Sequence, residues 1–223
     1  MVDLIRGLDA ERICTNLARI EAELEAACVR GARAPGSVEV LAAIKYVALE
    51  DLPTLAQAGV RVVGENRAQE LARKFDAHGR LFEWDFIGQL QSRRVRAILP
   101  HARLIHSVAS DSALAELERH RELARPGLRI LVEVNVAGEP GKAGVVPQQL
   151  DAFIARARLP VAGLMTMPPL SAQADSSRPW FAALRQLAAE RGLEHLSMGT
   201  SQDYVVAAEE GATIVRIGTK LYH

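Results

Sequence analysis

The stretch Val38-Glu-Val-Leu-Ala-Ala-Ile-Lys45 is the first of several apolar runs that indicate the fold. It is a short run of apolar and β-branched residues, typical of a strand that is buried on both faces of a parallel sheet. Lys45 then ends the strand at the rim where α/β proteins bind their ligands. Apolar neighbours partly desolvate an amine at such a place, which favours the neutral form that condenses with aldehydes. The alternative is a lysine whose stem packs on the strand end while its charge reaches solvent.

Runs of the same kind recur along the chain and alternate with helical segments. The predicted strands cover residues 38–44, 60–63, 84–87, 104–108, 128–136, 161–165, 194–198 and 213–217. The predicted helices cover residues 9–30, 51–58, 67–75, 90–99, 111–123, 147–157, 178–191 and 201–210. This alternation predicts an α/β fold, a single (β/α)8 TIM barrel with an extra N-terminal helix. An open doubly wound sheet is the second choice, because the Gly-x-Gly-x-x-Gly fingerprint is absent after the first strand.

Composition and charge exclude several classes of function. Lys plus Arg and Asp plus Glu number 27 each, so the chain lacks the basic surplus of a nucleic-acid binder. No apolar run approaches the ~18 residues of a membrane span, and the first ten residues lack the apolar core of a signal peptide. Cys14 and Cys28 lie ~21 Å apart on one predicted helix, too far for a disulfide. We therefore expect a cytoplasmic protein with one domain, residues 1–223, that binds neither nucleic acid nor membrane.

The loops after the last two predicted strands have the composition of an anion site. They read Ser197-Met-Gly-Thr-Ser201 and Gly218-Thr219. Glycine lets backbone N–H groups approach an anion, hydroxyls add donors, and Ser201 begins a predicted helix. Because all strands of a barrel open on one face, the two loops predict a phosphate site on the rim. Ordinary helix capping by Ser and Thr is the alternative.

Closure of the barrel would bring this phosphate site beside Lys45, since the eighth strand pairs with the first. A ligand that carries both an aldehyde and a phosphate would bridge them, and pyridoxal 5′-phosphate (PLP) is such a molecule. Arg216 lies two residues before Gly218 and so faces the same side of the strand. A permanent cation there would keep the pyridine nitrogen unprotonated. An ion pair of Arg216 with Glu133 or Glu65 inside the barrel is the alternative.

Motifs along nearly the whole chain resemble the YggS/PROSC-type pyridoxal phosphate homeostasis proteins. They are Leu41-Ala-Ala-Ile-Lys45, Gly64-Glu-Asn-Arg-Ala-Gln-Glu70, Trp84-Asp-Phe-Ile-Gly-Gln-Leu-Gln-Ser92, Gly163-Leu-Met-Thr-Met167, Ser197-Met-Gly-x-Ser-x-Asp203 and Gly211-Ala-Thr-x-Val-Arg-Ile-Gly-Thr219. The sequence departs from the family pattern at Asp85 and Gln89, where histidine is common at position 85, and in the glycine loop 138–144.

The resemblance implies the barrel of the alanine racemase N-terminal domain, with PLP on its rim as a Schiff base of Lys45. It also implies a set of further cofactor contacts, which are Asn66, Ser197, Ser201, Arg216, Gly218 and Thr219. The family resembles PLP carriers or regulators without an assigned reaction, so neither a catalytic residue nor a metal site is predicted. A monomer is expected, and apo-PLP enzymes are the candidate partners. A PLP-dependent racemase and a Schiff-base aldolase acting on a sugar phosphate are the alternatives.

Two further features carry a choice of interpretation. His106 ends a predicted strand and is either a general base or a hydrogen-bonded structural residue. Arg93, Arg94 and Arg96 fall on one predicted helix and are interpreted as a solvated face. Zinc and serine hydrolases are disfavoured, because the His-Glu-x-x-His, Cys-x-x-Cys and Gly-x-Ser-x-Gly motifs are absent from the sequence.

Overall fold

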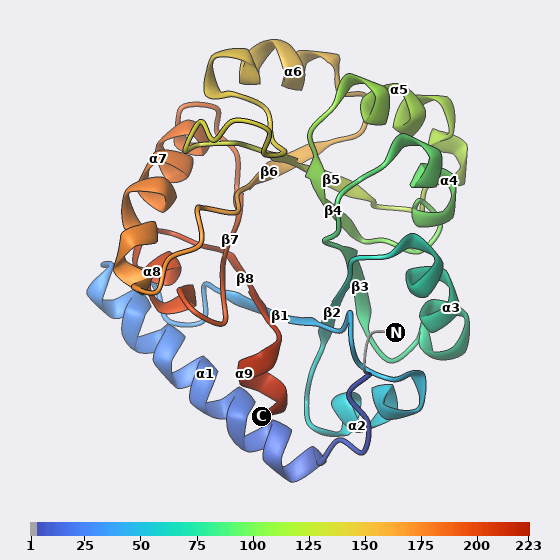
Figure 1. Cartoon of the computed structure of the whole chain (residues 1–223), viewed down its shortest axis with the longest axis vertical. Coiled ribbons are helices and arrows are strands. Elements are labelled where there is room, and N and C mark those ends of the chain that lie inside the picture. Colours follow the sequence, from blue (N-terminus) through green and yellow to red (C-terminus); the bar gives the residue numbers. More distant parts are fainter. Residues whose placement is uncertain (1–3) are drawn as a thin grey trace.

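Eight parallel strands close into a barrel in the computed structural model, which describes residues 4–223 (Figure 1). Residues 1–3, which begin the expected domain and the N-terminal stretch without a signal-peptide core, lie outside the described residues. The strands are β1 (Glu39–Ala43), β2 (Val62–Glu65), β3 (Glu83–Phe86), β4 (Leu104–Val108), β5 (Arg129–Glu133), β6 (Val161–Met165), β7 (His195–Thr200) and β8 (Ile214–Ile217). Because β8 pairs in parallel with β1, the expected TIM barrel is confirmed and the open sheet is excluded.

Helices surround the barrel, and all except the first and the last connect successive strands (Figure 1). They are α1 (Ala10–Arg30), α2 (Leu52–Gln57), α3 (Ala68–His78), α4 (Val95–Ile98), α5 (Asp111–Arg119), α6 (Leu150–Arg156), α7 (Arg178–Ala189), α8 (Tyr204–Glu209) and α9 (Thr219–Tyr222). Within residues 4–223, none of these helices has both the length and the apolar character needed to cross a membrane.

Three segments differ from the sequence-based expectation. The predicted helix 90–99 is a 3₁₀ turn at Ser92–Arg94 followed by the short α4. The predicted strand 128–136 ends at Glu133, because the chain then folds back and Val134 makes a single bridge to Val145. The turn between β7 and α8 is longer than expected, so α8 begins at Tyr204 instead of Ser201.

The extra N-terminal helix predicted from the sequence is confirmed as α1. Asp9 caps it, since its carboxylate accepts the N–H groups of Glu11 (2.9 Å) and Arg12 (3.3 Å). Its apolar face, which includes Ile13, Leu17, Ile20 and Leu24, is buried, and α1 packs against α8 and α9 (Figure 1). The Asn16 side chain donates to the carbonyl of Leu221 in α9 (3.1 Å), which ties α1 to the end of the chain.

The inside of the barrel holds its own apolar cluster, distinct from the larger core between strands and helices. Its buried members are Leu41, Val62, Leu104, Leu131, Met165 and Ile214. Side chains from alternating strands fill a TIM barrel in this way, so the interior is a packed core and carries no channel.

Truncation of Leu131 tests the contribution of this inner cluster. Leu131 is fully buried, so Leu131→Ala should lower the free energy of unfolding by about 2–5 kcal/mol through the cavity it leaves. Leu170→Ala is the matched control, because Leu170 is 90% exposed and its truncation should change stability by less than about 0.5 kcal/mol. Urea unfolding measures both, and equal losses would contradict the packing described.

Candidate ligand site at the carboxyl end of the barrel

A cavity of about 740 Å³ lies at the carboxyl ends of the strands. Its wall includes side chains that follow β1 and β2, the Gly218–Thr219 turn after β8, and the apolar residues Ile87 and Met167. The structure brings together six of the seven predicted ligand contacts around this single cavity. They are Lys45, Asn66, Ser201, Arg216, Gly218 and Thr219.

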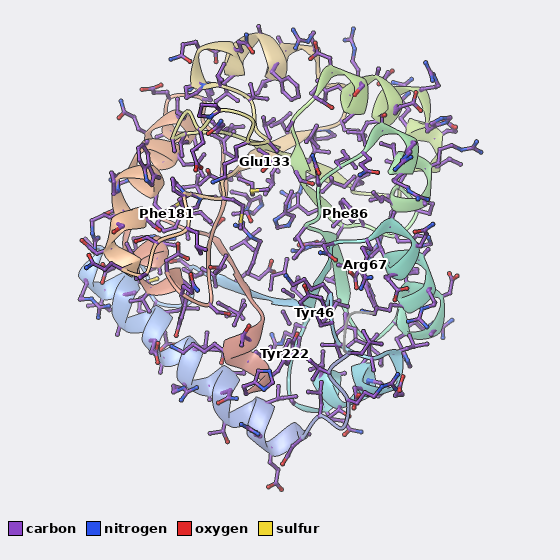
Figure 2. The ribbon with its side chains drawn as sticks, in the orientation of Figure 1. Tyr46, Arg67, Phe86, Glu133, Phe181 and Tyr222 are labelled. Carbon is purple, nitrogen blue, oxygen red and sulfur yellow. The ribbon has the colours of Figure 1, made fainter. Side chains whose placement is uncertain are left out.

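Lys45 is half-buried in the turn after β1, and its ammonium nitrogen lies 4.6 Å from the centre of the Tyr46 ring. The main chain around Lys45 is held at two points: the Arg67 guanidinium donates to the Lys45 carbonyl (3.0 Å), and the buried Tyr222 hydroxyl donates to the carbonyl of Ala43 (3.1 Å). Figure 2 labels Tyr46, Arg67 and Tyr222 in this part of the molecule. The sequence contains four lysines. The other three form ion pairs, Lys74 with Glu65, Lys142 with Glu139 and Lys220 with Glu23. Among the residues that the structure describes, Lys45 is thus the lysine whose amine has no carboxylate partner.

A buried ion pair fixes the ends of β1 and β2 relative to each other. Lys74 in α3 donates to the Glu65 carboxylate (2.7 Å) and to the carbonyl of Ile44 (2.7 Å), while the same carboxylate accepts the N–H of Asn66 (2.8 Å). Both charged side chains are almost completely buried. Ile44 directly precedes Lys45, and Asn66 itself lines the cavity. The Lys74–Glu65 pair therefore positions Lys45 and Asn66 as neighbours. Sequence reasoning missed it, although Lys74 falls on the buried stripe of α3 with Ala68 and Leu71.

Arg216 is a buried cation at the base of the cavity. Its guanidinium donates to the Ser197 hydroxyl, to the carbonyl of Thr166 (3.0 Å) and to the Met167 sulfur (2.9 Å). Burial lowers the pKa of Arg216 to about 10, against the opposing fields of Asp203 and Glu133, so the side chain stays charged at neutral pH. The predicted alternative of an ion pair with Glu133 or Glu65 is wrong within the described chain: Glu65 pairs with Lys74, and Glu133 makes no ion pair with Arg216.

The two loops predicted to bind an anion are joined by a hydrogen bond. The Ser201 hydroxyl oxygen accepts the N–H of Gly218 (3.2 Å). The expected position of Ser201 at a helix start is wrong, because Asp203 accepts the N–H of Thr200 (2.7 Å) and closes a turn before α8. Gly199 makes that turn possible: its φ is +92°, and a Cβ there would collide with Ala207 of α8. The hydroxyls of Ser201 and Thr219 remain beside the cavity.

Ser197 is the predicted contact that does not line the cavity. It is fully buried in β7, where its hydroxyl bonds to Arg216 and to Nδ1 of His106 (2.8 Å). It therefore touches the site through Arg216. His106, for which the sequence left two interpretations, is buried and takes part in this hydrogen-bonded structure.

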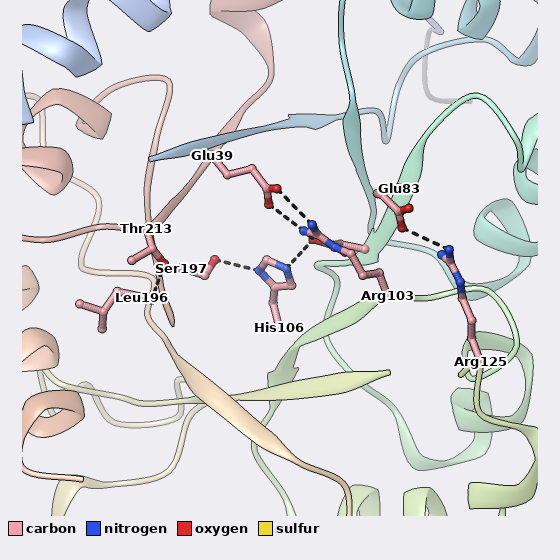
Figure 3. A network of polar contacts seen from close by, with 9 residues as sticks. Glu39, Glu83, Arg103, His106, Arg125, Leu196, Ser197 and Thr213 are labelled. Atoms are coloured by element: carbon pink, nitrogen blue, oxygen red, sulfur yellow. Dashed lines mark hydrogen bonds and ion pairs between the residues drawn. The ribbon is translucent and has the colours of Figure 1, made fainter. Parts of the chain in front are cut away.

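The hydrogen bonds continue from His106 to the amino ends of the strands (Figure 3). Nε2 of His106 lies 3.1 Å from the Asp85 carboxylate, which also accepts two bonds from Arg103 (3.0 and 2.8 Å). Arg103 in turn forms a two-bond ion pair with Glu39 (2.7 and 3.0 Å). The sequence indicated Asp85 only as a departure from a family pattern. Nothing in the sequence indicated that Arg103 pairs with Asp85 and Glu39.

Opposing effects set the protonation of the two buried groups at the centre of this structure. Burial lowers the pKa of His106, and the neighbouring Asp85 carboxylate only partly offsets that effect. Burial alone would raise the pKa of Asp85, but the hydrogen bonds from His106 and Arg103 outweigh it and lower that pKa. A neutral imidazole therefore donates to an ionised carboxylate at neutral pH.

Comparison with known proteins places the chain among PLP-associated barrels. The family described as "Alanine racemase, N-terminal domain" matches residues 16–223. A "Pyridoxal phosphate homeostasis protein" of Aquifex aeolicus is 40% identical over 94% of this chain and 96% of its own length. The structure of PipY from Synechococcus elongatus with PLP bound superposes with a TM-score of 0.79 at 31% identity, covering 95% of this chain and 100% of that one. An unknown protein from Bifidobacterium adolescentis gives a TM-score of 0.87 at 29% identity, over 99% and 98% of the two chains.

Lys74→Met tests the buried ion pair. The substitution leaves the Glu65 carboxylate buried without its cation, so we expect a loss of about 3–5 kcal/mol in the free energy of unfolding. Arg73→Met is the matched control at the neighbouring position: the Arg73–Glu70 pair is exposed and should contribute about 0.3–0.5 kcal/mol. Urea unfolding measures both variants. Similar losses would show that the Lys74 pair is no more important than a surface contact.

Acid should destabilise the folded protein through His106. Because its pKa is lower in the folded than in the unfolded state, the unfolded chain takes up the proton first as the pH falls below about 6.5. This contribution to stability is therefore complete above that pH and is lost progressively below it. Urea unfolding between about pH 7.5 and pH 5.5 should show a smaller loss for His106→Gln than for the unsubstituted protein. An identical pH dependence would contradict the buried neutral state of His106.

Proposed function

The chain belongs to the family of alanine racemase N-terminal domains, and from that premise we propose that it binds PLP and serves in PLP homeostasis. The relative from Aquifex aeolicus bears the name of a pyridoxal phosphate homeostasis protein, and PipY is a barrel with PLP bound. The observation that carries the proposal is the shared cavity: Lys45 and Arg216 both line one space of about 740 Å³.

The residues around the cavity fit this cofactor. The side-chain oxygen of Asn66 is buried and has no hydrogen-bond partner among residues 4–223, although a buried polar atom normally has one. An arginine has five N–H groups, and Arg216 uses three of them on Ser197, Thr166 and Met167. The unused donors belong to a buried cation without a carboxylate partner in the described chain. The Arg216 donors support a ligand with an acceptor atom, and the Asn66 oxygen supports a ligand that also offers a donor.

Each residue has a distinct proposed role. PLP supplies an aldehyde, which forms a Schiff base with a lysine amine, together with a phosphate and a pyridine nitrogen. Lys45 would provide the amine, and Arg216 would donate to the pyridine nitrogen. Asn66 would contact the polar edge of the ring. The phosphate would be held by neutral donors, which are the hydroxyls of Ser201 and Thr219 and the main-chain N–H of Thr219, while the Gly218 N–H holds the Ser201 oxygen.

We propose a carrier or regulator in preference to a catalyst, with apo-PLP enzymes as its partners. In support, the named relatives are homeostasis proteins. We further propose that residues 1–223 act as one PLP-binding domain and as a monomer, since closure pairs every strand of the barrel on both sides. Cys14 and Cys28 are free, which supports a cytoplasmic location.

Borohydride reduction of the protein with PLP tests the proposed role of Lys45. We expect a visible absorption band that is lost on reduction, with the mass of the reduced cofactor on the peptide that contains Lys45. Lys45→Ala should abolish both signals, because the other lysines are held in ion pairs. Lys142→Ala is the control and should keep them, since Lys142 does not line the cavity.

The same preparations separate a carrier from an enzyme. Alanine racemisation by the PLP-loaded protein should be negligible. Robust turnover of alanine would overturn the carrier role and favour the racemase alternative. Labelling of a different lysine, with Lys45→Ala unaffected, would overturn the proposed site.

A further inference from the structure

We propose that Ser197, His106 and Asp85 act as positioning residues for Arg216, holding its guanidinium in the orientation that recognises the ring nitrogen of the ligand. We call these three residues and Arg216 the barrel relay. The identity of the ligand rests on the proposed function, but the relay itself is a property of the protein alone. Its members come from β7, β4, β3 and β8 and are all at most 6% exposed.

The direction of each hydrogen bond in the relay follows from donor and acceptor chemistry. A guanidinium can only donate, so Arg216 makes the Ser197 oxygen an acceptor. The Ser197 hydroxyl is then free to donate its own proton to Nδ1 of His106, 2.8 Å away. His106 can accept at Nδ1 while Nε2 carries its proton, which is donated to the Asp85 carboxylate at 3.1 Å. The relay therefore runs one way, from Arg216 to Asp85.

Asp85 fixes this direction, because an ionised carboxylate can only accept. It keeps the proton of His106 on Nε2 and leaves Nδ1 as the acceptor that Ser197 needs. Arg103 holds Asp85 from the other side with two hydrogen bonds and is itself held by Glu39 (Figure 3). The anchor of the relay lies at the amino ends of the strands, far along the barrel from the cavity at their carboxyl ends.

The relay matters because Arg216 has no carboxylate to orient it within the described residues. Its other contacts are one carbonyl and one thioether, and Met167 is itself 44% exposed. Without the Ser197 acceptor, the long side chain would lose the contact that holds one side of the guanidinium. The expected consequence is specific: binding of the ring nitrogen weakens, whereas contacts to the aldehyde and phosphate are unaffected.

A comparison of PLP with its 1-deaza analogue measures that consequence. The analogue keeps the aldehyde and the phosphate but replaces the ring nitrogen with carbon. A charge-assisted hydrogen bond from Arg216 should make the unsubstituted protein prefer PLP by about tenfold or more in Kd. Ser197→Ala should reduce this preference to about threefold or less. Ser107→Ala is the matched control on β4: its buried hydroxyl donates to the carbonyl of Gly88 and not to Arg216, so the preference should be retained.

Two substitutions of His106 separate the two sides of its ring. The amide of His106→Asn can reach the position of Nδ1 and bond to Ser197, whereas the amide of His106→Gln extends to the position of Nε2, next to Asp85. If positioning passes through Ser197, the asparagine variant should retain more of the preference for PLP than the glutamine variant. Loss of preference in the glutamine variant alone supports the relay, and equal retention in both would overturn it.

Nitrogen NMR of His106 in the protein without PLP gives a test that is independent of ligand binding and of variant folding. The relay requires a neutral imidazole protonated on Nε2 at about pH 7. A proton on Nδ1, or a doubly protonated ring, would overturn the proposal. If the unsubstituted protein binds neither PLP nor the analogue, the proposed function fails while the NMR result still decides the relay. If PLP binds and Ser197→Ala keeps the full preference, the function stands and the relay is refuted.

Discussion

Parallel pairing of β8 with β1 is the constraint on which the site depends. The register places Arg216 opposite Leu41 and Ile217 opposite Ala42, so residues far apart in the sequence become neighbours. The Lys45 turn and the Gly218 turn emerge side by side as a result. In an open sheet, these strands would lie at different positions and the amine would not share a cavity with the arginine. Closure of the barrel therefore assembles the ligand site and also removes the exposed edges of the sheet.

Buried charge is handled in two different ways around that closure. Lys74 and Glu65 neutralise each other and use their remaining hydrogen-bonding capacity on main-chain groups, so the pair is satisfied without a ligand. Arg216 is satisfied only in part: it has neutral acceptors but no carboxylate among residues 4–223. Burial of an uncompensated cation costs free energy, and a ligand with acceptor atoms reduces that cost. The first arrangement is typical of a structural ion pair and the second of a binding site.

The sequence predicted what depends on periodicity and on strand ends. Short apolar runs that alternate with predicted helical segments are sufficient to indicate the barrel. The residues at the ends of these runs then fall on the same rim of the barrel. This reasoning identified Lys45 and Arg216 before any contact was known, whereas Asn66 was expected as a contact from the family resemblance. It could not identify the partners of Arg216 or Lys74, because a hydrogen bond depends on which rotamers meet inside the barrel. Ser201 shows the same limit: a turn closed by Asp203 moved the helix start, and its hydroxyl turned to the N–H of Gly218.

The division of charge within the cavity suits a protein that must both hold and release a phosphorylated ligand. The groups beside the proposed phosphate position are hydroxyls and main-chain N–H groups, and Lys220 nearby is occupied by Glu23. Neutral donors bind a phosphate less tightly than a guanidinium clamp does, because charge-assisted bonds are roughly twice as strong. Arg216, the buried cation that lines the cavity, would instead be directed to the ring end by contacts inside the barrel. Selectivity for the ring would thus come from a fixed arginine, while the exposed phosphate end would stay weak enough for exchange with a partner.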